Sequence, residues 1–180
     1  PDAPRGVAVV VVLAAATTPE AARATLESLL AQTLPPSKVV VVTVGTSPAV
    51  PLVRSRLDLL PFAARLVPEP GATLAAALDT GGAATTAPWL VAIEPPHAFA
   101  PRHLESLVEG VVGRGAHWGF SECVLEPFGD VAPAVMATHA AANDATRTSI
   151  AKVETLGFAF LNQAFAPVGS GAVLFARSLH

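Results

Sequence analysis

The sequence has few charged residues, one cysteine and no tyrosine. Charged side chains make up 14% of its 180 residues, against about 25% in typical soluble domains. This low charge indicates a surface partly covered by something else, either the remainder of a longer polypeptide or a protein partner. The 11 basic residues form no cluster and the net charge is -3, so the electrostatic footprint of a nucleic-acid-binding protein is missing. We therefore expect no nucleic-acid partner.

The lone Cys123 excludes an internal disulfide. In its apolar phrase GFSECVL a buried thiol and a nucleophile remain the alternatives, and a free thiol is consistent with the cytoplasm. No apolar run approaches the ~20 residues that span a bilayer. The phrase PRGVAVVVVLAAATTPEA has the parts of a secretory signal, but four consecutive valines favour a strand. We expect a cytoplasmic protein or the cytoplasmic domain of a membrane protein.

Length and composition predict one domain over residues 1–180. The hydrophobic fraction of 52% is enough for a single core. The only methionine is Met136, and none begins the chain, so we expect a fragment of a longer protein. Segments outside the fragment would then carry any membrane association.

Apolar runs and amphipathic stretches alternate along the chain. Residues 7–13 and 38–45 are apolar without alternation, which is typical of strands buried on both faces. Between them, TTPEAARATLESLLAQTLPP predicts a helix capped by Thr17 or Thr18 and ended by the Pro-Pro pair. The other expected elements are a helix over 51–60, a strand over 64–67, a helix over 71–87 interrupted by Gly81-Gly82, a strand over 89–94, a helix over 101–115 opened by Pro101, strands over 117–126 and 172–176, and a long loop over 127–150.

This order predicts an α/β fold of three layers, with a mostly parallel twisted sheet flanked by helices. We expect residues 9–13, 39–44 and 89–93 to form adjacent central strands. Ligands of such sheets bind beyond the carboxyl ends of the strands, so the residues that follow each strand are the candidate site. The Gly-rich phosphate loops GxGxxG and GxxxxGK are absent, which weakens the usual dinucleotide and nucleoside-triphosphate interpretations.

Three stretches resemble the family 2 glycosyltransferases, whose nucleotide-sugar-binding domain has the GT-A fold. ATLESLLAQTLPPSKVVVV resembles the family's TLxSLLxQT helix and the apolar strand that ends in Asp-Asp-Gly-Ser. ALDTGGAATTAPWLVAIEPPHAFAPRHLESLV is similar to an Ala-Arg-Asn-x-Gly helix followed by a strand that ends in Asp-x-Asp-Asp. SGAVLFARS resembles the family's acceptor-side strand. The resemblance implies a GT-A fold and the transfer of a sugar from a nucleotide-diphosphate donor to an acceptor.

The resemblance also implies a nucleotide site at Ala14, Glu20, Thr43, Val44 and Asp79. Thr43 and Val44 stand where the family has two aspartates, which read the nucleotide base, and Val44 cannot accept a hydrogen bond. Glu20 occupies a first-helix acid position. Asp79 takes the place of an Asn or Asp that lies beside the nucleotide in the family. Alternatively, Asp79 is a turn residue at the end of its helix, without a role in binding.

A divalent cation, Mn or Mg, bound with the nucleotide sugar is a further implication of the resemblance. Glu94 replaces the first aspartate of Asp-x-Asp, Pro96 the second, and His97 the acid that follows. Glu94 and His97 can still ligate a metal, and imidazole favours Zn or Mn over Mg. We expect no tightly held ion, because Pro96 is not a ligand. Alternatively, Glu94 caps the next helix or faces water, and His97 is solvated.

The resemblance places the catalytic base some 20 or more residues after SGAVLFARS, beyond His180, so the segment alone is not expected to transfer sugar. For the remaining candidates we expect ordinary roles. His103 and His117 are expected at the surface and Arg177 in solvent, unless Arg177 pairs with a phosphate. Trp89 and Trp118 are expected in the core or at its rim.

Three functions stay open at this point. The chain is an active transferase domain, a catalytically degenerate GT-A domain that serves as an interaction or scaffolding module, or an unrelated α/β domain that binds a small ligand. Thr43, Val44, Pro96 and the low surface charge favour the second. A nucleotide-dependent rise in melting temperature would favour the first.

Overall fold

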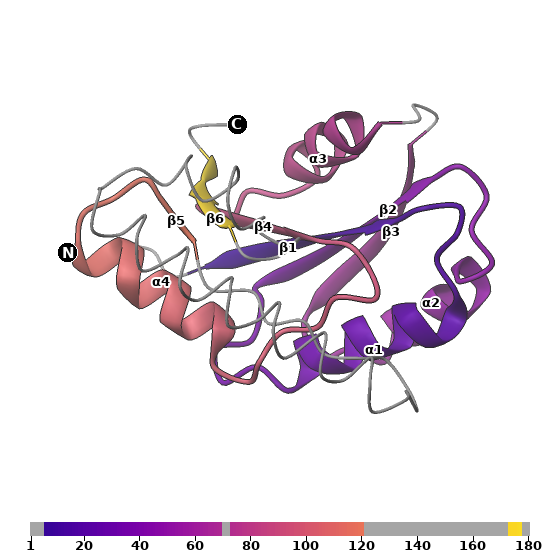
Figure 1. Cartoon of the computed structure of the whole chain (residues 1–180), viewed down its shortest axis with the longest axis horizontal. Coiled ribbons are helices and arrows are strands. Elements are labelled where there is room, and N and C mark those ends of the chain that lie inside the picture. Colours follow the sequence, from indigo (N-terminus) through magenta and orange to yellow (C-terminus); the bar gives the residue numbers. More distant parts are fainter. Residues whose placement is uncertain (1–5, 70–72, 121–172, 178–180) are drawn as a thin grey trace, which may run out of the picture.

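The structure, a computed structural model, describes residues 6–69, 73–120 and 173–177 (Figure 1). Helices and strands alternate along the chain as expected. The elements are β1 (Val7–Leu13), α1 (Pro19–Leu30), β2 (Lys38–Val44), α2 (Val50–Leu57), β3 (Ala63–Glu69), α3 (Leu74–Ala83), β4 (Trp89–Ile93), α4 (His103–Gly113), β5 (Trp118–Phe120) and β6 (Val173–Ala176). None of the helices in this part of the chain is long and apolar enough to cross a membrane.

The strands form one sheet in the order β3-β2-β1-β4-β6-β5. β1 pairs in parallel with β2 on one side and with β4 on the other, with Val9 opposite both Val39 and Val91. All seven residues of β1 are buried, and the five central residues of β2 are buried as well. The three apolar runs are therefore adjacent central strands, and the expected α/β class with a mostly parallel sheet is confirmed.

β6 lies between β4 and β5 and runs antiparallel to both. Ala176 is opposite Trp89 of β4, and Phe175 is opposite Trp118 of β5. A strand was expected at this place in the sequence, but its direction and its neighbours were not. The remainder of the strand expected over 117–126, the loop expected over 127–150 and Cys123 lie outside the described residues.

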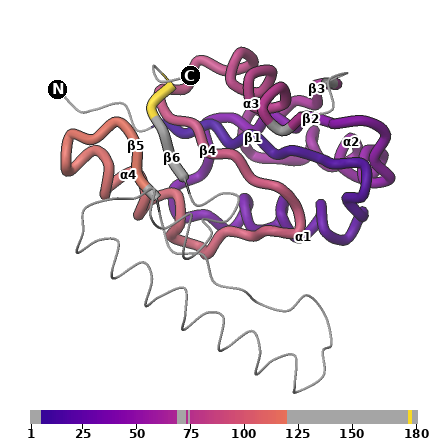
Figure 2. Tube along the Cα trace, turned by 45° about the horizontal axis from the view of Figure 1, so that its top comes forward, coloured from indigo at the N-terminus to yellow at the C-terminus, as the bar shows by residue number. Residues whose placement is uncertain are grey.

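Helices cover both faces of the sheet, which gives the expected three layers. α1, α2 and α4 lie on one face and α3 lies on the other (Figures 1 and 2). Side chains of β1 alternate between two apolar clusters: Val9 and Val11 join the cluster under α1, α2 and α4, and Val10 and Val12 join the cluster under α3. A strand that is buried on both faces needs apolar residues at every position, and the valine run supplies them.

α3 runs without a break through Gly81 and Gly82, so the predicted interruption is wrong. A Cβ atom at Gly81 would lie 2.4 Å from Cγ1 and 2.8 Å from Cγ2 of Val10. The glycine therefore serves close packing of the helix on β1 instead of a break in the helix. The end of α3 is also tied to the sheet, because Lys38 Nζ donates to the carbonyl oxygen of Ala84 at 2.8 Å.

Local polar contacts set the ends of the other helices. Thr18 caps α1 by accepting a hydrogen bond from the N–H of Ala21 at 3.2 Å, as one of the two predicted alternatives. α4 begins at His103 instead of at Pro101, and Arg102 precedes its first turn without a side-chain cap. Pro101 thus belongs to the turn that leads into α4.

Candidate functional site

The carboxyl ends of β1, β2 and β4 meet at one edge of the sheet. Leu13 at the end of β1 is opposite Thr43, and Val11 is opposite Ile93, the last residue of β4. Ala14, Val44 and Glu94, which follow or end these strands, therefore share this edge. The structure brings together the residues that the sequence placed after the three central strands.

The loops that follow β1 and β2 are joined by the buried Ser47. Its Oγ donates to the carbonyl oxygen of Thr17 at 3.2 Å and accepts from the N–H of Ala49 at 3.3 Å. The turn between Val44 and Ser47 passes through Gly45, whose φ of 73° lies in the left-handed region that favours glycine. The loops that follow β1 and β2 are therefore held together by hydrogen bonds of one buried side chain.

Thr43 and Val44 have largely apolar surroundings. Thr43 is 9% exposed, and Val44 packs against the apolar cluster under α3. Glu20 lies exposed in the first turn of α1. The end of β2 therefore has no carboxylate at the position where family 2 glycosyltransferases, which the sequence resembles, have the aspartates that contact the nucleotide base.

Asp79 lies apart from these residues, exposed in the middle of α3. It precedes Gly81 by two positions, about 200° around the helix, and Gly81 is the residue that touches β1. Asp79 is thus on the side of α3 turned away from the sheet. The helix continues for four residues after it, so Asp79 is a helix-interior residue instead of a terminal turn residue.

A tight turn follows β4 and fixes the ring of His97. The N–H of His97 donates to the carbonyl oxygen of Glu94 at 3.0 Å, and Nδ1 of the ring lies 2.6 Å from the same oxygen. A carbonyl oxygen only accepts, so Nδ1 carries the proton, and in the neutral ring Nε2 keeps a lone pair. A ring whose Nδ1–H is held by a backbone carbonyl is the usual form of a metal-ligating histidine.

Two polar residues of α1 and one that follows its C-cap hold the loop after this turn; we name Thr25, Ser28 and Gln32 the α1 clamp. Oγ1 of Thr25, a fully buried residue, donates to the carbonyl oxygen of His97 at 2.7 Å. Oγ of Ser28 accepts from the N–H of Phe99 at 3.1 Å. These contacts join residues that are about seventy positions apart in the sequence, and they determine where the Glu94–His97 turn lies.

Gln32 makes the most extensive contacts of the clamp, and it is 7% exposed. Its Nε2 donates to the carbonyl oxygens of Ala100, at 2.8 Å, and Ser28, at 3.0 Å, while its Oε1 accepts from the N–H of Leu104 at 3.1 Å. Sequence reasoning did not single out this group. The available signal was the i, i+3 spacing of Thr25 and Ser28, which places two polar side chains on one side of α1, whereas Gln32 lies beyond the end of the helix.

The exposed rim of this contact carries a charged pair. Glu105 Oε2 accepts from Nε of Arg102 at 2.8 Å and from Oγ1 of Thr33 at 3.0 Å. Both hydrogen bonds favour the ionised carboxylate and lower the pKa of Glu105, and the same contact raises the pKa of Arg102. His103 stacks on Phe99 with ring centroids 4.4 Å apart, so it has a packing role beside the clamp.

Metal ligands are few in this region. Across residues 6–69, 73–120 and 173–177, no group of three or more His, Cys, Asp or Glu side chains is placed to hold a metal ion. Glu94 and His97 would thus supply two protein ligands, and the other positions of a bound cation would fall to the diphosphate and water.

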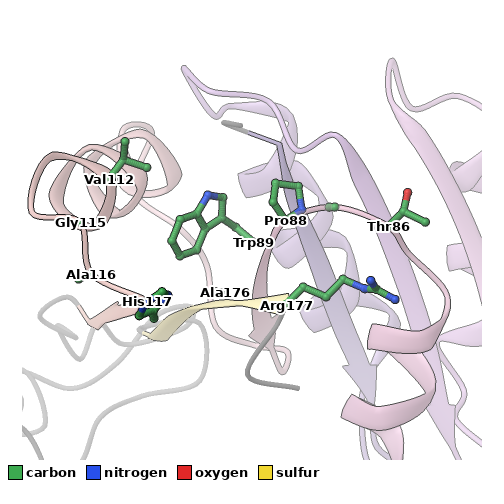
Figure 3. Close-up of a pocket in the computed structure, with 10 residues that line it drawn as sticks. Thr86, Pro88, Trp89, Val112, Gly115, Ala116, His117, Ala176 and Arg177 are labelled. Carbon is green, nitrogen blue, oxygen red and sulfur yellow. The ribbon is translucent and has the colours of Figure 1, made fainter. Parts of the chain in front are cut away.

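A cavity lies at the opposite edge of the sheet, beside the amino end of β4 (Figure 3). Its volume is about 510 Å³, and Trp89, the first residue of β4, is part of its wall. Cavity size and sheet topology therefore point to different edges. For a nucleotide we favour the carboxyl edge, because ligands of open α/β sheets bind in the crevice beyond the strand ends.

No protein-family model matches the sequence, and no curated protein matches it. Solved structures do match. A mannosyltransferase from Pyrobaculum calidifontis, PcManGT, in complex with GDP-Man and Mn²⁺ has a TM-score of 0.63 and 21% identity, covering 96% of this chain and 45% of that one. S. aureus TarS 1-349 in complex with UDP has a TM-score of 0.55 and 14% identity, covering 71% and 38%. The chain thus spans less than half the length of either protein. At these identities the likeness shows the fold, and the chain has a GT-A-like glycosyltransferase fold.

Proposed function

We propose that the chain is the nucleotide-sugar-binding domain of a glycosyltransferase, with the donor at the carboxyl edge of β1, β2 and β4. The observation that carries the proposal is the Glu94–His97 turn, held at this edge by the α1 clamp with His97 Nδ1 on the carbonyl oxygen of Glu94. The structures with the same fold add support, since they were solved with UDP, UDP-GlcNAc and GDP-Man with Mn²⁺.

In this proposal each residue has a defined part. The Glu94 carboxylate and His97 Nε2 hold Mn²⁺ beside the diphosphate, and the imidazole favours this ion over Mg²⁺. When bound, the cation neutralises the diphosphate leaving group. Ala14, Thr43 and Val44 border the nucleotide base, and Glu20 lies further out as a polar contact. Asp79, which faces away from the sheet, is given no contact with the donor. None of these residues is assigned as the general base that deprotonates the acceptor hydroxyl.

Donor binding should stabilise the chain in a metal-dependent way. With UDP-GlcNAc or GDP-Man at about a hundred times its Kd, together with Mn²⁺, we expect roughly 2.7 kcal/mol of stabilisation and a melting temperature about 5–10 °C higher. Glu94→Gln and His97→Gln should remove the Mn²⁺-dependent part, because each removes one protein ligand. Differential scanning fluorimetry with and without Mn²⁺ measures both effects.

Glu109→Gln is the matched control for these substitutions. Glu109 is an exposed residue of α4, outside the proposed site, so its removal should leave the nucleotide shift unchanged. An equal loss in Glu109→Gln and Glu94→Gln would contradict the assignment of the metal ligands. Absence of any shift with uridine or guanosine nucleotides would contradict donor binding itself.

A second candidate function is a degenerate GT-A domain that serves as an interaction module. Two observations favour it: the end of β2 offers the buried Thr43 and the half-buried Val44 where the resembled family has acids, and the described residues include no cluster of three metal-ligating side chains. The same fluorimetry separates the two functions, since an interaction module would show no shift with any nucleotide.

Val44→Asp should strengthen nucleotide binding by about two- to tenfold. The new carboxylate lies at the strand end and supplies the acceptor that Val44 lacks, and one such hydrogen bond is worth roughly 0.5–1.5 kcal/mol. The loss of apolar contact with the cluster under α3 should lower stability at the same time. Isothermal titration with UDP and GDP in the presence of Mn²⁺ measures the change. Val44→Ala is the control, and an equal gain there would show that the carboxylate is not responsible.

A further inference from the structure

The cavity at the amino edge of the sheet has no part in the proposed donor site. It lies between the end of α4, the first residue of β4 and the end of β6, with a volume of about 510 Å³. Figure 3 shows the indole of Trp89 between the end of α4 and β6, and the side chain of Arg177 running below Pro88 toward Thr86. The volume falls within the range of about 300–1,000 Å³ that is usual for small-molecule sites.

The walls of this cavity are mainly apolar. Trp89, Pro88, Val112, Ala116 and Ala176 supply most of the lining. The neighbouring backbone groups are already used, because the N–H of Arg177 donates to the carbonyl oxygen of Pro88 and that of Ala176 donates to the carbonyl oxygen of His117, both at 2.7 Å. Polar recognition of a ligand is thus left to side chains.

The polar side chains of the lining are cationic or neutral. Arg177, His117 and Thr86 belong to it, and no aspartate or glutamate does. Within the described residues, no carboxylate lies within 4.0 Å of the Arg177 guanidinium. This absence of acids contrasts with the whole chain, in which 14 acidic residues outnumber 11 basic ones. A guanidinium beside an apolar wall is suited to an oxyanion on an apolar body, because it can donate two parallel hydrogen bonds to such a group.

We propose that this cavity is a second binding site, which takes a small organic anion with an apolar or aromatic body. Arg177 binds its carboxylate or phosphate group, and the apolar wall around Trp89 and Val112 contacts the body. The site lies at the edge of the sheet opposite the Glu94–His97 turn, so it does not depend on the proposed donor binding.

Trp89 can report on this site when it is the only tryptophan. Trp118→Phe removes the other tryptophan of the chain, which is 49% exposed and outside the cavity lining. In the full chain carrying this change, benzoate and phenyl phosphate should alter the Trp89 fluorescence in a saturable way. Benzyl alcohol, which lacks the charge, and acetate and inorganic phosphate, which lack the ring, should bind at least tenfold more weakly.

Arg177→Gln should weaken benzoate and phenyl phosphate binding about tenfold or more, because a charge-assisted hydrogen bond is lost. Arg114→Gln is the matched control, since Arg114 lies at the end of α4 outside the lining and should bind as the parent does. Ala116→Leu fills the cavity and should abolish binding, with circular dichroism to show that each variant is folded. Equal binding by the charged and neutral probes, an equal loss in the two arginine variants, or no saturable signal would overturn the proposal.

Discussion

Replacing Gly81 by alanine is expected to destabilise the protein by about 2–3 kcal/mol and to lower the melting temperature by roughly 5–10 °C. The added Cβ would lie 2.4 Å from Cγ1 of Val10, and Val10 is 2% exposed in the middle of β1. A buried, β-branched side chain has no other rotamer space to occupy, so α3 would have to move away from the sheet. This cost exceeds the gain of up to about 1 kcal/mol that alanine normally has over glycine inside a helix. Urea unfolding followed by circular dichroism measures the difference.

Gly110→Ala is the matched control, because Gly110 is also inside a helix. A Cβ there would meet only Nη1 of Arg114, at 3.5 Å, so alanine should leave stability unchanged or raise it by about 0.5–1 kcal/mol. Val10→Ala combined with Gly81→Ala should cost less than the sum of the two single changes, because it removes the clashing atoms. Strict additivity of the two changes, or equal effects of alanine at 81 and 110, would show that close packing of α3 on β1 is not the reason for Gly81.

Gln32→Leu is expected to destabilise the protein by about 2–3 kcal/mol. Leucine has a similar size and suits a site that is 7% exposed, but it has no polar atoms. The substitution therefore leaves the N–H of Leu104 without its acceptor and the carbonyl oxygen of Ala100 without one of its donors. A buried polar group that loses its partner costs about 1–3 kcal/mol. The amide of Leu104 should therefore exchange its hydrogen at least tenfold faster, and urea unfolding measures the loss of stability.

Ser55→Ala is the control for Gln32→Leu. Ser55 is exposed on α2, where its Oγ donates to the carbonyl oxygen of Leu52, and its loss should change stability by less than about 0.5 kcal/mol. Gln32→Leu should also reduce the Mn²⁺-dependent nucleotide shift, since the Glu94–His97 turn loses part of its support. Unchanged Leu104 exchange in a folded Gln32→Leu protein would contradict the role of the clamp.

Local patterns in the sequence were sufficient for the central sheet. The valine run of β1 and its counterparts in β2 and β4 predicted three buried, adjacent strands, because only strands covered on both faces need an apolar side chain at every position. Thr18, Glu20 and the Pro19 first turn likewise marked the start of α1. These features depend on residues close in sequence, so a linear pattern contains them.

Contacts between distant residues were decided by the tertiary structure. The two glycines of α3 look like a helix break in sequence, and only the packing on Val10 shows why Gly81 lies inside a continuous helix. The position of β6 between β4 and β5, and its antiparallel direction, were also decided by the tertiary structure. A strand of four residues contains no sequence signal for its direction or its neighbours.

The candidate site shows the same division. Sequence order predicted that Ala14, Val44 and Glu94 follow strands and so share an edge, but the α1 clamp joins Thr25 and Gln32 to a loop about seventy residues away. The spacing of Thr25 and Ser28 on α1 predicts that they share a face, whereas their hydrogen-bond partners exist only once the loop after β4 has packed against that face. The position of the Glu94–His97 turn is therefore a property of the folded chain, because its hydrogen-bond partners are brought within reach by folding.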